Sequence, residues 1–281
     1  MHRIFQRVVS MVAMLVLACM AQATDRRAQS TDCSTSVCAQ GSVSTERVFD
    51  LQLRNGNHQR VLYATAANAR AIIVMLPGGA GDIGIGQSGD LRHDENFVVR
   101  SRALWIGRGY DVLIPDTLNS ENLRGLRSSP AYAALVDELV HFAHTKSSAA
   151  VFLLGTSQGS IAAMNGAAHL SRTQLAGVVL TESVSRQGGS HETVFQANPQ
   201  DVRVPALVVA NHDDRCDVAP PEDAPQIVAA MSNSPQVKLL YVRGGISRSS
   251  KLCGSLTPHG YYGIESNVVG QIADWMDRHL R

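Results

Sequence analysis

Val151-Phe-Leu-Leu-Gly-Thr-Ser-Gln-Gly-Ser160 is the most informative stretch of this chain. An apolar run of strand length leads directly into the pattern G-x-S-x-G at residues 155–159, and Ile161 to Ala168 then has the composition of a helix. In a strand–turn–helix setting this pattern predicts a tight turn that lifts the side chain of Ser157 above the sheet. Glycines fit at both ends, because a side chain there would collide with the neighbouring strand or with the incoming helix. The alternative, a Gly/Ser loop without chemistry, is disfavoured by the flanking strand and helix.

The regions around this turn alternate between strand and helix patterns. Residues 46–53 and 59–63 flank Asn55-Gly56, a strong turn signal, and predict a β-hairpin. Continuous apolar runs are typical of parallel strands that are covered on both faces. Such runs occur at 71–76, 110–115, 175–181, 204–210 and 238–242, and helices are predicted at about 96–108, 131–145, 158–169, 223–231 and 261–280. The order predicts an α/β fold: a doubly wound, mostly parallel sheet with an antiparallel N-terminal hairpin, in one domain over 46–281.

The composition is that of an ordinary globular protein. The chain has 281 residues, of which 44% are hydrophobic and 17% charged, and its formal net charge is +1. Basic residues are scattered and nearly balanced by acidic ones, so the sequence gives no reason to expect a nucleic-acid partner. A small-molecule substrate fits this composition better, and the oligomeric state is left open.

The N-terminus has the pattern of an export signal. Basic residues at the start precede an apolar run, Val8 to Met20, and a small-x-small cleavage site follows at Ala21-Gln22-Ala23. We therefore expect residues 1–23 to be a signal peptide, with no stable membrane span after cleavage and a periplasmic or secreted protein. Lipidation of Cys19 is the minority alternative. Residues 24–45 are polar and predict an arm with little order.

A serine hydroxyl needs a base to take its proton and a third group to orient that base. Both residue types follow Ser157 in the chain. Asp213 and Asp214 come directly after the predicted strand at 204–210, and His259 lies in the loop between the last strand and the last helix. Functional groups of open α/β sheets gather at the carboxyl ends of the strands. The order Ser, Asp, His is the one that the turn motif predicts.

From about residue 46 onward the chain resembles the α/β-hydrolase superfamily, in particular an exported, esterase-like serine hydrolase. This resemblance rests on the G-x-S-x-G turn, the order of strands and the place of His259. It implies Ser157 as nucleophile, His259 as base and Asp214 as the orienting acid, with Asp213 second and Asp217 third. Glu182, at the end of its own strand, is an outside alternative for the acid. His191, His212 and His279 are weaker candidates for the base.

The resemblance also implies an oxyanion hole of two backbone N–H groups. One is that of Gln158, just after the nucleophile. The other lies in Pro77-Gly-Gly-Ala80, which is similar to the family's His-Gly-Gly-Gly loop, with Gly79 preferred over Ala80. Pro77 stands where the family often has His, and a proline side chain cannot make the hydrogen bond that usually anchors that loop.

Four cysteines remain beyond the expected signal, and export favours their pairing. We favour Cys33 with Cys38 in the polar arm, and Cys216 with Cys253. Cys216 is two residues after Asp214 and Cys253 six before His259, so this bridge would join the acid loop to the base loop.

The resemblance thus implies hydrolysis of carboxylic esters of modest size through an acyl-enzyme, without cofactor or metal. Peptidase, thioesterase or acyltransferase activity, and a non-catalytic binding protein of the same fold, are the alternatives. The polar segment at 182–203 is short, so no large lid is expected.

Overall fold

A computed structural model describes residues 45–280. One mixed sheet of eight strands runs through this part of the chain in the order β1-β2-β4-β3-β5-β6-β7-β8. The strands are β1 (Thr45–Gln52), β2 (His58–Thr65), β3 (Ala71–Leu76), β4 (Tyr110–Pro115), β5 (Ala150–Thr156), β6 (Gly177–Thr181), β7 (Ala206–Asn211) and β8 (Val237–Val242). The first two strands pair antiparallel as the predicted hairpin, β2 is also antiparallel to β4, and all other pairs are parallel. The predicted α/β fold is confirmed.

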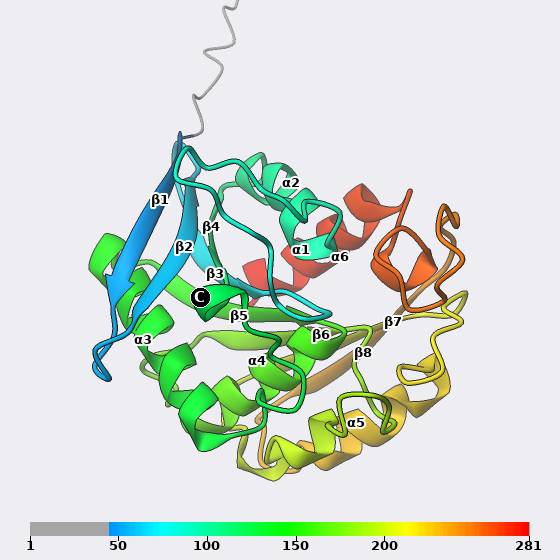
Figure 1. Ribbon diagram of the computed structural model, residues 1–281. Coiled ribbons are helices and arrows are strands. Elements are labelled where there is room, and N and C mark those ends of the chain that lie inside the picture. Colours follow the sequence, from blue (N-terminus) through cyan, green and yellow to red (C-terminus); the bar gives the residue numbers. More distant parts are fainter. Residues whose placement is uncertain (1–44, 281) are drawn as a thin grey trace, which may run out of the picture. The chain divides into compact units, whose positions relative to one another are not determined.

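Helices cover both faces of the sheet, as a doubly wound fold requires. On one face lie α3 (Pro130–Lys146), α4 (Gln158–His169) and α5 (Ala224–Ala230), and on the other lie α1 (Phe97–Arg100), α2 (Arg102–Ile106) and α6 (Glu265–Asp277) (Figure 1). Strands β3, β4, β6 and β7 are buried along their whole length, because each lies between two helical layers. Their uninterrupted apolar sequences follow from that position.

Two of the predicted helices differ from the structure. The helix predicted at 96–108 is divided at Ser101, whose ψ of −5° departs from the α-helical value and interrupts the turn between α1 and α2. The helix predicted to begin at Tyr261 begins at Glu265, because Tyr261 and Gly263 both have positive φ, 55° and 88°. The left-handed region cannot be part of a right-handed helix.

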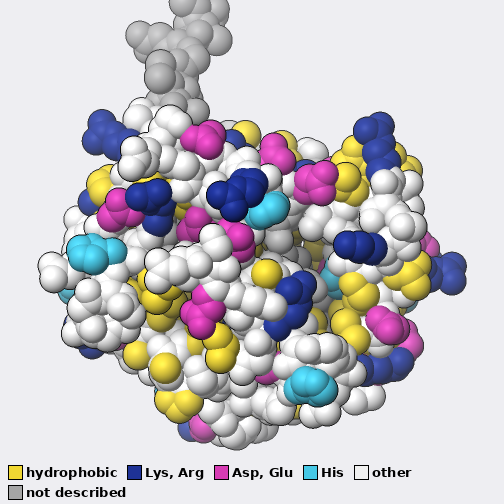
Figure 2. Space-filling view, viewed as in Figure 1, with side chains coloured by type: hydrophobic (Ala, Val, Ile, Leu, Met, Phe, Trp, Pro, Cys, Tyr) yellow, Lys and Arg dark blue, Asp and Glu magenta, His cyan; other side chains and the backbone are white. Residues whose placement is uncertain are grey.

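The segment at 182–203 is described in full and contains only two short 3-10 turns, η2 (Val194–Gln196) and η3 (Pro199–Asp201). No helical lid therefore covers the sheet at this point, as predicted. Basic and acidic side chains are interspersed over the face seen in Figure 2. Among the described residues, no helix has the length and apolar composition to cross a membrane. The expected signal peptide, the polar arm, Cys19, Cys33 and Cys38 lie outside the described residues.

Candidate active site

Ser157 sits at the sharp turn between β5 and α4, with φ 52° and ψ −122°. Non-glycine residues rarely adopt this region, and its cost is typically about 1–3 kcal/mol. Two hydrogen bonds fix the turn: the Ser157 N–H donates to Thr181 O (2.9 Å), and the Ser160 hydroxyl donates to Ser157 O (2.6 Å). The neighbouring strand β6 and the first turn of α4 thus hold Ser157 in its strained conformation.

The glycines of the motif are required by close backbone contacts. A Cβ on Gly155 would lie 2.1 Å from the carbonyl oxygen of Gly159, and a Cβ on Gly159 would lie 2.1 Å from that of Leu76. Neither obstacle is a flexible side chain, so no rotamer change could relieve the overlap. The turn is therefore available to this sequence only because both positions are glycine.

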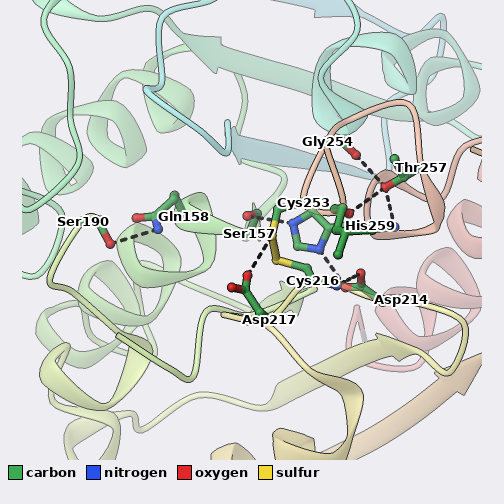
Figure 3. Close-up of a disulfide and its surroundings, with 11 residues drawn as sticks. Ser157, Gln158, Ser190, Asp214, Cys216, Asp217, Cys253, Gly254, Thr257 and His259 are labelled. Atoms are coloured by element: carbon green, nitrogen blue, oxygen red, sulfur yellow. Dashed lines mark hydrogen bonds and ion pairs between the residues drawn. A yellow bond between two sulfur atoms is a disulfide. The ribbon is translucent and has the colours of Figure 1, made fainter. Parts of the chain in front are cut away.

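His259 and Asp214 join Ser157 in one chain of hydrogen bonds (Figure 3). His259 Nε2 lies 2.9 Å from Ser157 Oγ, and its Nδ1 lies 2.7 Å from Asp214 Oδ2. The side chains of His259 and Asp214 are 3% and 0% exposed. Since a carboxylate can only accept, Nδ1 carries the proton and Nε2 is left to accept from the serine hydroxyl. This tautomer is the one that general-base chemistry at Ser157 needs.

Further hydrogen bonds hold Asp214 and the turn that carries His259. The other oxygen of Asp214 accepts the Cys216 N–H (2.8 Å). His259 lies in the 3-10 turn η5 (Pro258–Gly260), whose N-cap is Thr257. The Thr257 hydroxyl accepts the His259 N–H and donates to carbonyl oxygens in the preceding loop, including Gly254 O at 2.8 Å. Both loops therefore hold the imidazole and the carboxylate by fixed backbone contacts.

Apart from Glu182, the remaining candidate acids and bases lie away from the Ser157 hydroxyl. Asp213 is exposed and accepts the Gly244 N–H (2.6 Å), and Asp217 is exposed beside Cys253. Among the histidines, His212 stacks on Tyr241, His191 is exposed, and His279 lies against Trp275 O and Gln236. Of the candidate bases, His259 lies against the Ser157 hydroxyl, and of the candidate acids, Asp214 lies against His259.

A bridge between Cys216 and Cys253 joins the loop of Asp214 to the loop of His259. This is the pairing favoured from the sequence. Cys216 is buried, and Cys253 lines the cavity beside Ser157. The bridge is therefore part of the site. Figure 3 shows the two sulfur atoms between Ser157 and Asp217.

A cavity of about 80 Å³ opens beside Ser157. Gly79 lines this cavity and Ala80 does not, which agrees with the preference for Gly79 as an oxyanion donor. Within residues 45–280, the Gly79 N–H has no hydrogen-bond partner. The Gln158 N–H is the first of α4, and the first N–H groups of a helix have no partner within it. The Gln158 side chain points away and donates to Ser190 Oγ (3.0 Å).

Several residues that line this cavity were not predicted from the sequence. Asn96 and Phe97 come from the start of α1, and Ser255 comes from the loop before His259. Asn96 and Ser255 lie outside the helices and strands, where no periodicity marks a buried face. Larger cavities of about 720 Å³ and 660 Å³ lie against β1 and near Asp116, and neither includes Ser157, His259 or Asp214.

Glu182 is a second buried carboxyl group at the site. It is 1% exposed, has a φ of 44°, and accepts the Asn211 N–H on Oε1 (2.9 Å). Burial, and then the charge of Asp214, raises the pKa of Glu182 well above its usual range. Burial also raises the pKa of Tyr261, which packs against it.

Two sets of side chains in the described region bring three possible metal donors within 4.8 Å of one another. In the first, Cys216, Asp217 and Cys253, the two sulfur atoms are bonded to each other. In the second, Glu182, Asp214 and His259, the imidazole Nδ1 is engaged with Asp214. Neither set presents three free ligands to an ion.

The eight-stranded sheet with helices on both faces is similar to that of solved esterases and a dienelactone hydrolase. No family model and no curated protein sequence matches the chain. Solved structures do: an esterase from Pyrococcus furiosus aligns with TM-score 0.60 at 11% identity, over 84% of this chain and 93% of that one. A dienelactone hydrolase from Anabaena variabilis has TM-score 0.56 at 15% identity, covering 84% and 99%. A cold-adapted esterase from an Arctic intertidal metagenomic library has TM-score 0.56 at 15% identity, covering 85% and 95%. At these identities the likeness concerns the fold, and the chain has the α/β-hydrolase fold.

Proposed function

We propose that the protein is a serine hydrolase that acts on carboxylic esters of modest size through an acyl-enzyme. One observation carries this proposal: Ser157, His259 and Asp214 form a continuous chain of hydrogen bonds of 2.9 and 2.7 Å at the carboxyl ends of the strands. A strained nucleophile turn and a cavity beside the hydroxyl support the same conclusion. The esterases and the dienelactone hydrolase of the same fold are consistent with it.

The reaction that we propose uses the side chains of Ser157, His259 and Asp214 together with two backbone N–H groups. His259 Nε2 takes the proton as Ser157 Oγ attacks the ester carbonyl carbon, and Asp214 stabilises the imidazolium that forms. The negative charge on the former carbonyl oxygen is met by the N–H groups of Gln158 and Gly79, and the α4 dipole adds to this stabilisation. His259 then gives its proton to the leaving alcohol. Water, activated by the same imidazole, attacks the acyl-enzyme and releases the acid and Ser157.

The small cavity supports a short acyl group. Its volume of about 80 Å³ is small beside the roughly 300–1,000 Å³ of typical ligand pockets. A long acyl chain would have to lie outside it. Peptidase, thioesterase and acyltransferase chemistry would use the same nucleophile and differ in the leaving or accepting group.

The experiment is a comparison of hydrolysis rates on p-nitrophenyl acetate and on a peptide and a thioester with the same acyl group. We expect the ester to be the best substrate of the wild type, and Asp214→Asn to lower kcat roughly 10⁴-fold because the wrong tautomer of His259 is favoured. Asp213→Asn is the matched control and should retain wild-type kcat. No turnover of any of the three substrates would favour a binding protein of this fold.

We also propose that the protein is exported, as the N-terminal pattern indicates. The Cys216–Cys253 bridge supports this, since structural disulfides persist mainly in oxidising compartments. The mass of the N-terminal peptide after expression in a bacterial host tests it. A start at Thr24 is expected, a lipidated Cys19 would make the protein a lipoprotein, and an intact Met1 in the cytoplasm would contradict export.

A further inference from the structure

Glu182 and Asp214 are two buried carboxyl groups in contact within one site. One oxygen of each, together with a ring nitrogen of His259, lies within 4.8 Å of the others. Two adjacent carboxylates in a site shielded from water repel each other strongly, and such a pair keeps one proton. That proton must reside mainly on one of the two groups.

The donors around the pair favour a charge on Asp214. Asp214 accepts from the imidazole of His259 and from the Cys216 N–H, and both of its oxygens are thereby satisfied. Among residues 45–280, Glu182 accepts the Asn211 N–H on Oε1, and the nearby Tyr261 hydroxyl directs its hydrogen to Val209 O. Its Oε2 is buried and has no hydrogen-bond donor among the described residues. An unpartnered carboxylate oxygen at such a position is costly, whereas a protonated oxygen would itself be a donor.

We propose that Glu182 is a neutral carboxylic acid that donates a hydrogen bond from Oε2 to Asp214, and thereby positions the carboxylate that orients His259. This inference rests on the proposed function for its catalytic consequence, but the protonation state is a property of the folded protein. Glu182 is a positioning residue, because it acts on Ser157 only through Asp214 and His259.

The backbone holds Glu182 for this role. Its N–H donates to Val209 O (3.1 Å), and its left-handed conformation turns the side chain at the end of β6. Asn211, which donates to Oε1, also donates from its side chain to Gly244 O and Pro258 O on the histidine side of the site. The titratable groups that face Glu182 are Asp214, His259 and Tyr261, and Tyr261 donates its hydroxyl hydrogen to Val209 O (3.2 Å). None of the three is a cation that would hold Glu182 in its charged form while His259 is neutral.

Infrared difference spectroscopy tests the proton directly. The spectrum of the wild type minus that of Glu182→Gln, at pH 7, should contain the C=O stretch of a protonated carboxyl group. Glu222→Gln is the matched control, since the Glu222 side chain is 65% exposed and should contribute only carboxylate bands. If no protonated band is lost with Glu182, the proposal is wrong, whether or not the protein hydrolyses esters.

Kinetics test the positioning role. Glu182→Gln keeps a neutral donor at the same place, so kcat/KM should stay within about threefold of wild type and its pH profile should not move. Glu182→Met has similar length and no donor, so Asp214 becomes more basic and the acid limb of the profile should move to higher pH. We expect kcat/KM at pH 7 to fall about tenfold in this variant, near the lower end of what a hydrogen bond to a charged group contributes.

Two kinetic results would overturn the proposal. A loss of roughly 10⁴-fold in Glu182→Gln, equal to that expected for Asp214→Asn, would make Glu182 the charged acid that orients His259. A pH profile of Glu182→Met identical to that of the wild type, with unchanged thermal stability, would show that no hydrogen bond to Asp214 is lost.

Discussion

At the scale of single residues, the site depends on a backbone conformation at Ser157 that a free chain would rarely adopt. Ser157 has a φ of 52°, and Gly155 and Gly159 on either side of it lie in close contact with neighbouring backbone. Strain of this kind persists only where the neighbouring structure determines it fully. The hydroxyl is thereby kept within 2.9 Å of the imidazole.

The first prediction concerns the glycines of this turn. Gly159→Ala places a Cβ 2.1 Å from Leu76 O, and we expect it to lower the free energy of unfolding by about 3 kcal/mol. Gly189→Ala is the control, because nothing lies within 4 Å of its Cβ, and it should change stability by less than about 0.5 kcal/mol. Urea unfolding measures both, and equal midpoints for the two variants would contradict the account of the turn.

The second prediction concerns the pH dependence of stability. Because burial raises the pKa of Glu182, the folded state keeps a proton that the unfolded state releases above about pH 4.5. Stability therefore falls as the pH rises from that value toward the raised pKa of the folded state. Glu182→Gln has no proton to release, so its melting temperature relative to wild type should increase between pH 5 and pH 8. A constant difference across this range would show that the pKa of Glu182 is not raised.

At the scale of elements, two loops at the ends of β7 and β8 make one unit. The Cys216–Cys253 bridge, the Asn211 side chain and the bond of His259 to Asp214 all connect the acid loop with the base loop. Each contact reduces the freedom with which the imidazole could leave the carboxylate. The separation of the cysteines by 37 residues makes the bridge a substantial constraint on the unfolded chain.

The third prediction follows from this unit. The double variant Cys216→Ala/Cys253→Ala should lose about 2–4 kcal/mol of stability, and kcat should fall more than KM rises because the triad loses its fixed geometry. Calorimetry and steady-state kinetics measure the two effects. Reduction of the wild type should reproduce them, and full activity with both thiols shown to be free would contradict the role of the bridge.

At the scale of the whole molecule, the sequence was sufficient for the architecture. The apolar runs predict buried strands, because a parallel strand between two helical layers is apolar on both faces. Asn55-Gly56 predicts the hairpin. The divided helix at Ser101 and the late start of α6 were missed. Both depend on local backbone angles, which periodicity does not record.

The site could be predicted in part for a related reason. Ser157 and Asp214 follow the ends of β5 and β7, and His259 lies in the long loop between β8 and α6, so the order of the elements brings all three to one edge of the sheet. The contact of Glu182 with Asp214 and the lining of the cavity by Asn96 and Ser255 depend on how irregular loops fold back. Such contacts have no signature in spacing or composition.

The fourth prediction concerns the substrate and uses the whole cavity. With about 80 Å³ beside Ser157, kcat/KM should fall at least tenfold from p-nitrophenyl acetate to the octanoate. Gly79, which lines this cavity, has no side chain that could pack against the additional carbon atoms of a long acyl chain. A maximum at octanoate would show that acyl groups bind elsewhere.

The most direct test of the central claim is covalent labelling of the native protein by a fluorophosphonate, read out by mass spectrometry of the peptide that contains Ser157. The account predicts one label per molecule at Ser157, with His259→Gln reducing the labelling rate strongly and His212→Gln leaving it unchanged, because only His259 touches the hydroxyl. Absence of label on Ser157 in the folded protein, or equal labelling rates in the two histidine variants, would contradict it.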